Sequence, residues 1–80
     1  MVLIGIITGE YEGNSYAKLI AVEEFEGRAG CYGRNAVISK AQYKLVKDEI
    51  LPNKDLYLGS EVQLYYDRFG KVCNIALLNN

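Results

Sequence analysis

The chain has 80 residues, of which 50% are hydrophobic and 24% charged, and this composition is typical of a folded domain and excludes a disordered chain. Its formal net charge of −1 argues against a protein held to nucleic acid by bulk charge, although a local basic stripe is compatible with it. This length predicts one domain over residues 1–80. The sequence has no histidine, and Cys31 and Cys73 are too few for a four-ligand zinc site. We expect two buried free thiols, with a disulfide as the alternative.

Residues 2–8 are apolar and β-branched at both odd and even positions, which predicts a central strand covered on more than one side. The N-terminal stretch lacks a basic leader and a small-residue cleavage pattern, so we expect a strand rather than a signal peptide. No stretch approaches the roughly 20 apolar residues that span a bilayer. We therefore expect a cytoplasmic protein with no membrane partner. Residues 9–15 contain two glycines, an Asn and a Ser, and predict a loop.

Residues 16–25 and 31–38 predict two further strands, joined by a turn at residues 26–30. Ser39 then opens a capping box that ends at Gln42, with Ile38 and Tyr43 placed as a hydrophobic staple, so we predict a helix starting at Lys40. Pro52 disfavours helical geometry at the residue before it, so the helix should end near residue 50 or 51. The apolar stripe of this helix comprises Ala41, Leu45, Val46 and Ile50.

Residues 61–78 predict a closing hairpin, because two apolar-rich runs flank the turn Asp67-Arg68-Phe69-Gly70 and glycine fills its positive-φ position. Alternation in the first run turns Val62, Leu64 and Tyr66 toward the core. The order β-β-β-α-β-β predicts a mainly β fold, a small five-stranded OB-like barrel with one short helix between strands 3 and 4. An SH3-like barrel with a helical insertion and an α+β sheet with the helix on one face are alternatives.

The sequence contains few groups for enzymatic chemistry. It shows no nucleophile in a recognisable elbow, no glycine-rich phosphate loop and no histidine. We therefore expect no enzymatic activity, no cofactor and no metal. Carboxylates at residues 23, 24 and 26 have the oxygen chemistry that binds hard cations, but we expect them to form a solvated strand end.

Aromatic and basic residues alternate along several predicted strands, and the seven tyrosines are a high share for this length. Single-stranded nucleic acid is held by aromatic faces on which bases stack, while Lys and Arg track the phosphates. Tyr and Arg are also enriched in protein interface hot spots, so a protein partner or a second copy of the chain is the alternative ligand. The candidate nucleic-acid-binding residues are Tyr16, Lys18, Tyr32, Arg34, Tyr65, Arg68, Phe69 and Lys71.

The pairs Tyr16-x-Lys18 and Tyr32-x-Arg34, the chain length and the five-strand organisation together carry a loose resemblance. In these features the chain resembles the small OB-fold single-stranded DNA-binding proteins of filamentous phages and related mobile elements. The resemblance implies a homodimer that binds single strands cooperatively.

Overall fold

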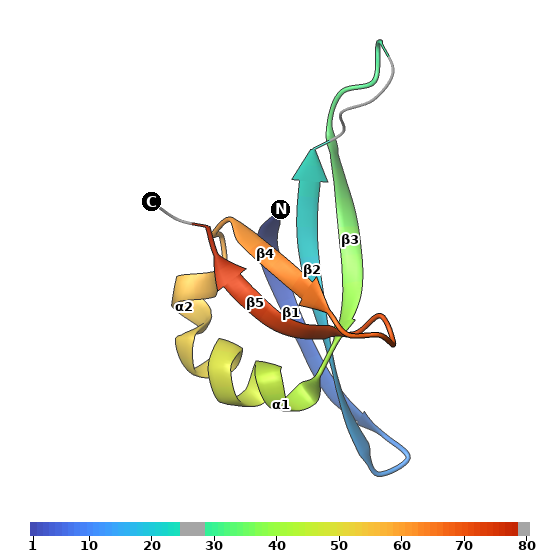
Figure 1. The fold of residues 1–80 in the computed structure, drawn as a ribbon, viewed down its shortest axis with the longest axis vertical. Helices are drawn as coiled ribbons and strands as arrows, with labels where there is room; N and C mark the ends of the chain where they lie inside the picture. The colour runs from blue at the N-terminus through green and yellow to red at the C-terminus, as the bar shows by residue number, and fades with distance from the viewer. Residues whose placement is uncertain (25–28, 79–80) are drawn as a thin grey trace.

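The computed structural model describes residues 1–24 and 29–78, which form five strands and a short helical segment (Figure 1). The helical segment runs between β3 and β4, so the mainly β class and the position of the helix are confirmed. The strands are β1 (Val2–Tyr11), β2 (Asn14–Glu24), β3 (Arg34–Ala41), β4 (Val62–Tyr66) and β5 (Val72–Leu77). The helical pieces are α1 (Tyr43–Leu45), η1 (Val46–Ile50), η2 (Leu51–Asn53) and α2 (Lys54–Tyr57).

The strands form one sheet in the order β1-β2-β3-β5-β4, and this sheet is not closed into the expected barrel. The N-terminal end of β1 contacts the segment that leads into β4 through an isolated bridge between Val2 and Glu61 and a few backbone hydrogen bonds, while within the described chain β3 pairs with β5 only at Ala41 and Val72. The sheet stays open because its strands differ in length. The first two strands have 10 and 11 residues, whereas β4 and β5 have 5 and 6, so the long strands run past the short ones in both directions (Figure 1).

The first strand lies at an edge of the sheet, so the prediction of a central strand is wrong. Leu3 is fully buried, but Ile4 is 54% and Ile7 39% exposed. A break in register between Leu3 and Gly5 shows how the strand carries apolar residues at both odd and even positions without being covered on both faces.

The connection between β1 and β2 is a two-residue turn instead of the expected loop over residues 9–15. Glu12 and Gly13 both have positive φ, 52° and 79°, which is the geometry that lets a tight turn follow the twist of its strands. The predicted end of the second strand at Phe25 lies outside the described residues. Of the predicted turn at residues 26–30, only residues 29 and 30 are described. Residues 31–33 precede β3, which starts at Arg34 rather than at Cys31.

The predicted capping box is wrong, because residues 39–41 belong to β3 and the helical segment begins at Tyr43. Gln42 occupies the N-cap position with no side-chain capping bond. The hydroxyl of Ser39 faces the core side instead, where its Oγ lies 3.1 Å from Tyr66 Oη. Ile38 is 63% exposed, which is incompatible with a staple onto the helix.

The sequence predicts that Pro52 ends the helical segment, and this prediction is wrong. Pro52 falls in the first turn of η2, where a backbone N–H is not needed. The chain passes from η1 through this 3₁₀ turn into α2 and leaves helical geometry after Tyr57. The helical stretch therefore extends beyond the predicted end at residue 50 or 51.

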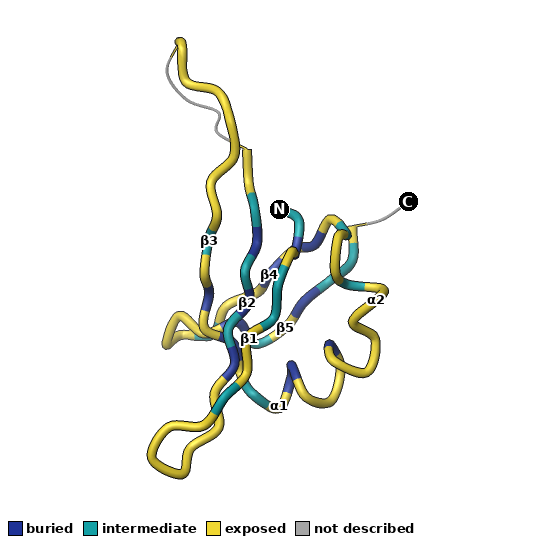
Figure 2. Tube along the Cα trace, turned by 180° about the vertical axis from the view of Figure 1, so that it is seen from behind, coloured by how far each residue is buried: buried dark blue, intermediate teal, exposed yellow. Residues whose placement is uncertain are grey.

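The core lies between the inner face of the sheet and the helical segment (Figure 2). Leu45, Val46 and Ile50 are buried there, as predicted, and so are Val62 and Leu64. Tyr66 is 49% exposed rather than buried, because a break in register after Tyr65 interrupts the alternation. The fully buried side chains are Leu3, Leu19, Val46, Ile50, Val62 and Val72.

The two cysteines are free thiols, and they differ in exposure. Cys31 is exposed before β3 and Cys73 is half-buried in β5, so the expectation of two buried thiols is wrong for Cys31. No helix within residues 1–24 and 29–78 has the length and apolar character needed to cross a membrane.

Candidate nucleic-acid interface

The side of the β1–β2–β3 sheet that faces away from the core, called the outer face below, carries two opposed lysines. Residues 17, 19 and 21 of β2 are buried, so Tyr16 and Lys18 project from the outer face. The register places Lys18 directly opposite Lys40 of β3. Like charges in this position destabilise a sheet. Among the described residues neither lysine takes part in an ion pair, so the fold itself gives no reason for this pairing.

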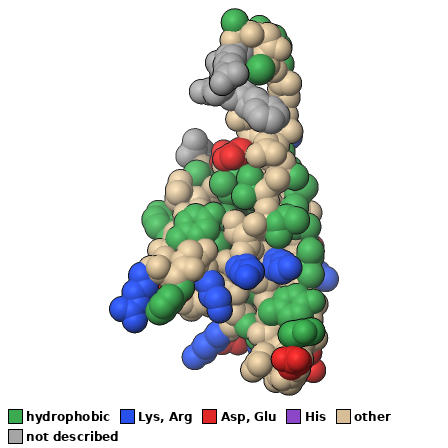
Figure 3. Space-filling model, turned by 90° about the vertical axis from the view of Figure 1, so that its right-hand side faces the viewer, with side chains coloured by type: hydrophobic (Ala, Val, Ile, Leu, Met, Phe, Trp, Pro, Cys, Tyr) green, Lys and Arg blue, Asp and Glu red, His purple; other side chains and the backbone are tan. Residues whose placement is uncertain are grey.

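A third lysine joins this pair. The single parallel contact between Ala41 and Val72 brings the start of β5 beside the end of β3, and so places Lys71 near Lys40. We call Lys18, Lys40 and Lys71 the lysine band. Figure 3 shows Lys and Arg side chains gathered across one face of the molecule, with hydrophobic side chains above and below them.

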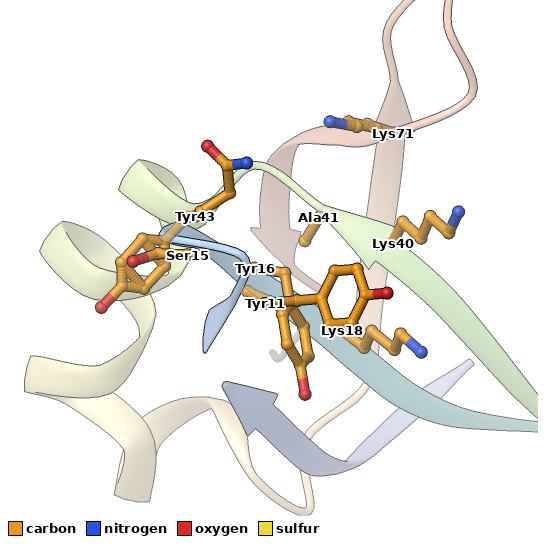
Figure 4. A pocket seen from close by; sticks show the side chains of 10 residues that line it. Tyr11, Ser15, Tyr16, Lys18, Lys40, Ala41, Tyr43 and Lys71 are labelled. Atoms are coloured by element: carbon orange, nitrogen blue, oxygen red, sulfur yellow. The ribbon is translucent and has the colours of Figure 1, made fainter. Parts of the chain in front are cut away.

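The lysine band borders an open groove of about 460 Å³ (Figure 4). Three tyrosines from separate elements share this groove: Tyr11 ends β1, Tyr16 lies in β2 and Tyr43 begins α1. The ammonium group of Lys18 lies 5.8 Å from the centroid of the Tyr16 ring. The lining residues are Tyr11, Asn14, Ser15, Tyr16, Ala17, Lys18, Lys40, Ala41, Tyr43 and Lys71.

The turn between β4 and β5 is organised by Asp67. Its Oδ1 accepts hydrogen bonds from the backbone N–H of Phe69 (2.9 Å) and Lys71 (3.0 Å), and its Oδ2 accepts one from Gln42 Nε2 (3.2 Å). The bond from the Lys71 backbone, with smaller contributions from Gln42 and Phe69, holds the pKa of the Asp67 carboxyl below its usual range. The turn is thereby tied both to itself and to the residue that follows β3.

Two predicted residues occupy the tip of this turn. The guanidinium carbon of Arg68 lies 4.8 Å from the centroid of the Phe69 ring, and Phe69 is 73% exposed. An exposed aromatic ring with a cation over one face, held next to Lys71, extends the lysine band with a further aromatic surface.

The remaining candidate residues, Tyr65, Arg34 and Tyr32, lie outside the groove. Tyr65 is 48% exposed on β4, opposite Asn74, and does not line the groove. Arg34 pairs with Glu24, six positions along the strand from the Lys18–Lys40 pair, which corresponds to about 20 Å. Tyr32 lies beyond it and is 89% exposed. The structure thus brings Tyr16, Lys18 and Lys71 together and leaves Tyr32 and Arg34 at the far end of the β2–β3 hairpin.

Sequence reasoning missed Lys40 and Tyr43 as groove residues. Lys40 was assigned to a helix, although it continues the two-residue alternation of Arg34, Ala36 and Ile38 on β3. That alternation was the available signal. Tyr43 is predicted as part of a hydrophobic staple, and it packs partly against the core while also lining the groove.

The described residues contain no group of three or more Cys, Asp or Glu side chains placed to hold a metal ion. Glu24 instead lies 4.0 Å from Arg34, and both side chains are largely exposed. Glu26 is outside the described residues. Comparison with protein-family models, with curated proteins and with solved structures finds no match to this chain.

Proposed function

We propose that this chain is a non-enzymatic module that binds single-stranded nucleic acid in the groove beside the lysine band. The observation that carries the proposal is the direct opposition of Lys18 and Lys40, with Lys71 beside them and with no ion-pair partner in the described part of the chain. Three cations along one groove form a site for an anion with repeated charges. A phosphodiester backbone has that chemistry.

The groove also supplies aromatic surface, which distinguishes a nucleic acid from a simple polyanion. Tyr11, Tyr16 and Tyr43 line it, and Phe69 lies exposed on the adjoining turn. Bases stack on such rings with little dependence on sequence, at about 1–3 kcal/mol per base. A single strand exposes its base faces for this contact, whereas a duplex does not.

The topology supports the same proposal. In the OB-fold, a partly open five-stranded barrel, the ligand lies on strands 2 and 3 and is reached by the loops between strands 1 and 2 and between strands 4 and 5. Here the groove lies on β2 and β3, with Tyr11 beside the first of these turns and Lys71 beside the second. An OB-like arrangement of the strands is part of this proposal, and so is the resemblance to the small single-stranded DNA-binding proteins of filamentous phages and related mobile elements.

Fluorescence titration with an oligo-dT strand tests the proposal. Three phosphate contacts predict a salt slope of about −2, and so roughly 20-fold weaker binding at about 200 mM than at about 50 mM salt. Lys40→Ala should weaken binding and lower the slope by about 0.7. Lys47→Ala is the matched control, because Lys47 is exposed on η1 and does not line the groove. Absence of binding at the lower salt concentration, or equal effects of the two substitutions, would contradict the proposal.

Two tyrosine substitutions locate the site within the molecule. Tyr16→Ala removes a ring from the groove and should weaken oligo-dT binding by about 5-fold or more. Tyr32→Ala, about 20 Å or more away along the hairpin, should change the affinity less than about twofold. A larger loss for Tyr32→Ala than for Tyr16→Ala would move the site to the far end of the hairpin.

A protein-docking role is a second candidate, favoured by exposed apolar side chains on the outer face. Ile38 is 63% exposed and lies directly opposite Ile20, in the row next to the Lys18–Lys40 pair. Apolar contacts of this kind predict a partner whose affinity changes little with salt. Ile38→Lys should abolish capture of such a partner without weakening oligo-dT binding, because the new cation lies beside the lysine band.

A further inference from the structure

Within residues 1–24 and 29–78, no strand pairs with the outer edge of β1 over most of its length. Its first two residues are covered, because Val2 bridges Glu61 and Leu3 exchanges backbone hydrogen bonds with Gly59 (2.7 Å) and Ser60 (3.2 Å). From residue 4 to residue 11, the backbone within the described chain pairs with β2 alone. A row of backbone donors and acceptors on this edge is therefore available to another strand.

A register break between Leu3 and Gly5 marks the start of the open edge, but residues 4–9 lack the side chains that usually protect such an edge. They include no charged residue and no proline, and Ile4 and Ile7 are 54% and 39% exposed. The free edge of β3 differs, because Arg34 and Lys40 lie at its two ends. Exposed apolar edges without charges are sites at which strands from other chains add to a sheet.

We propose that a second copy of this chain pairs with the edge, β1 against β1 in antiparallel orientation about Ile7, to form a two-fold symmetric dimer. In this register Ile7 faces its own copy, Ile6 faces Thr8 and Gly5 faces Gly9, so no like charges oppose each other. The same operation on β3, centred on Val37, would set Arg34 opposite Lys40. The charge pattern therefore selects β1 over β3 as the self-pairing edge.

This pairing would place the outer faces of the two copies side by side. Antiparallel pairing of identical strands within one sheet has its two-fold axis perpendicular to the sheet, so the outer faces of both copies point the same way. Since Ile7 lies opposite Lys18 within each copy, the two lysine bands would flank the shared β1 pair on one continuous surface. The dimer itself does not depend on the proposed function, and its test is independent of nucleic acid.

The mass in solution tests the proposal directly. At about 100 µM, well above a micromolar Kd, we expect sedimentation equilibrium to give the mass of two 9.0 kDa chains. Ile7→Lys places two like charges opposite each other across the two-fold axis and should raise the dimer Kd at least about tenfold. Ile38→Lys is the matched control, an exposed isoleucine changed in the same way on β3, and should stay dimeric. Circular dichroism confirms that both variants fold.

A covalent variant makes the test specific for the register. With Cys31→Ser and Cys73→Ser to remove the native thiols, Ile7→Cys should oxidise to a disulfide-linked dimer, because directly opposed strand residues lie within disulfide reach. Ile38→Cys in the same background should not. The proposal is overturned if the wild-type chain is a monomer at about 100 µM, or if Ile38→Lys dissociates the dimer and Ile7→Lys does not. It is also overturned by an open series of larger species, which would indicate that β1 of one copy pairs with β3 of the next.

Discussion

The ring of Tyr16 lies across Gly9. These residues are directly opposed in the β1–β2 pair, and a β-carbon at Gly9 would lie 2.5 Å from Tyr16 Oη and 2.7 Å from its Cζ. The absence of a side chain at Gly9 therefore gives the ring its space on the sheet. This contact holds one aromatic surface of the groove in place next to Lys18.

Gly9→Ala should displace the Tyr16 ring, because no β-carbon fits at the present separation. We expect affinity for oligo-dT to fall by about 5-fold or more, the equivalent of about 1 kcal/mol of stacking. The melting temperature should change by less than about 8 °C, since the displaced ring is already 40% exposed. Fluorescence titration and thermal unfolding of the same samples measure both quantities.

Gly5→Ala is the control for this substitution. Gly5 lies on the same strand, but a β-carbon there would meet the Ile20 side chain at 3.4 Å, the lower end of ordinary contact. Binding of oligo-dT should remain within about twofold of wild type. Equal losses for both alanine variants would indicate that β1 itself, rather than the position of the Tyr16 ring, sets the affinity.

The hydrogen bond between Ser39 and Tyr66 predicts unequal effects of removing either hydroxyl. Ser39 is 8% exposed, whereas Tyr66 is 49% exposed. Tyr66→Phe leaves the buried Ser39 hydroxyl without this partner and should lower the free energy of unfolding by about 1–3 kcal/mol. Ser39→Ala leaves a Tyr66 hydroxyl that water can reach, and should lower it by only about 0.5–1.5 kcal/mol.

Urea denaturation of the two single variants and of the double variant measures these values. The double variant should be less destabilised than the sum of the single effects, because the unpaired hydroxyl is absent from it. Additive effects would show that this bond contributes little to the stability of the fold, and a larger loss for Ser39→Ala than for Tyr66→Phe would contradict the predicted order.

The residues around Ser39 also show where sequence patterns fail. Ser39 and Gln42 match a capping box, and Pro52 matches a helix stop, because both patterns are local. The competing interaction of Ser39 is with Tyr66, 27 positions later in the chain. Ser39 also pairs with Leu19 of β2 in the sheet, and no local pattern contains either of these long-range contacts.

Alternation succeeded where the environment on each side of a strand is uniform. It places Val62 and Leu64 in the core, where both are buried. It failed at Tyr66, where the register of β4 and β5 breaks. It also failed at β1, whose apolar residues at both odd and even positions predicted a central strand although β1 lies at an edge of the sheet.

The candidate site was predictable only in part because its residues come from five segments. Tyr16 and Lys18 are visible as a local pair, but Lys71 joins them only through the parallel contact between β3 and β5. The pair Tyr32 and Arg34 has the same local pattern and lies elsewhere, since hairpin length separates the two pairs. The spacing of residues along a strand therefore predicts on which face of the sheet each side chain lies, but it does not predict how far apart two such pairs lie in the structure.

The hydrogen bonds to Asp67 predict a pH dependence of stability. These bonds favour the charged carboxylate and lower its pKa in the folded state below the ordinary value of 3.8. The stabilisation is therefore fully present above about pH 5 and is lost as the pH falls below about 4, through the folded-state pKa. Asp67→Asn lacks this component, so the difference in unfolding free energy between wild type and variant should be constant from about pH 7 to 5 and should narrow below about pH 4.

Urea denaturation at a series of pH values measures the difference. Asp55→Asn is the matched control, because Asp55 lies exposed on α2 and accepts no hydrogen bond from the described residues through its side chain. The narrowing below about pH 4 should be larger for Asp67→Asn than for Asp55→Asn. If the Asp67→Asn curve also runs parallel to wild type below about pH 4, the turn at residues 67–71 is held by its backbone bonds and by Gly70, which has a φ of 80°, and the carboxylate is dispensable.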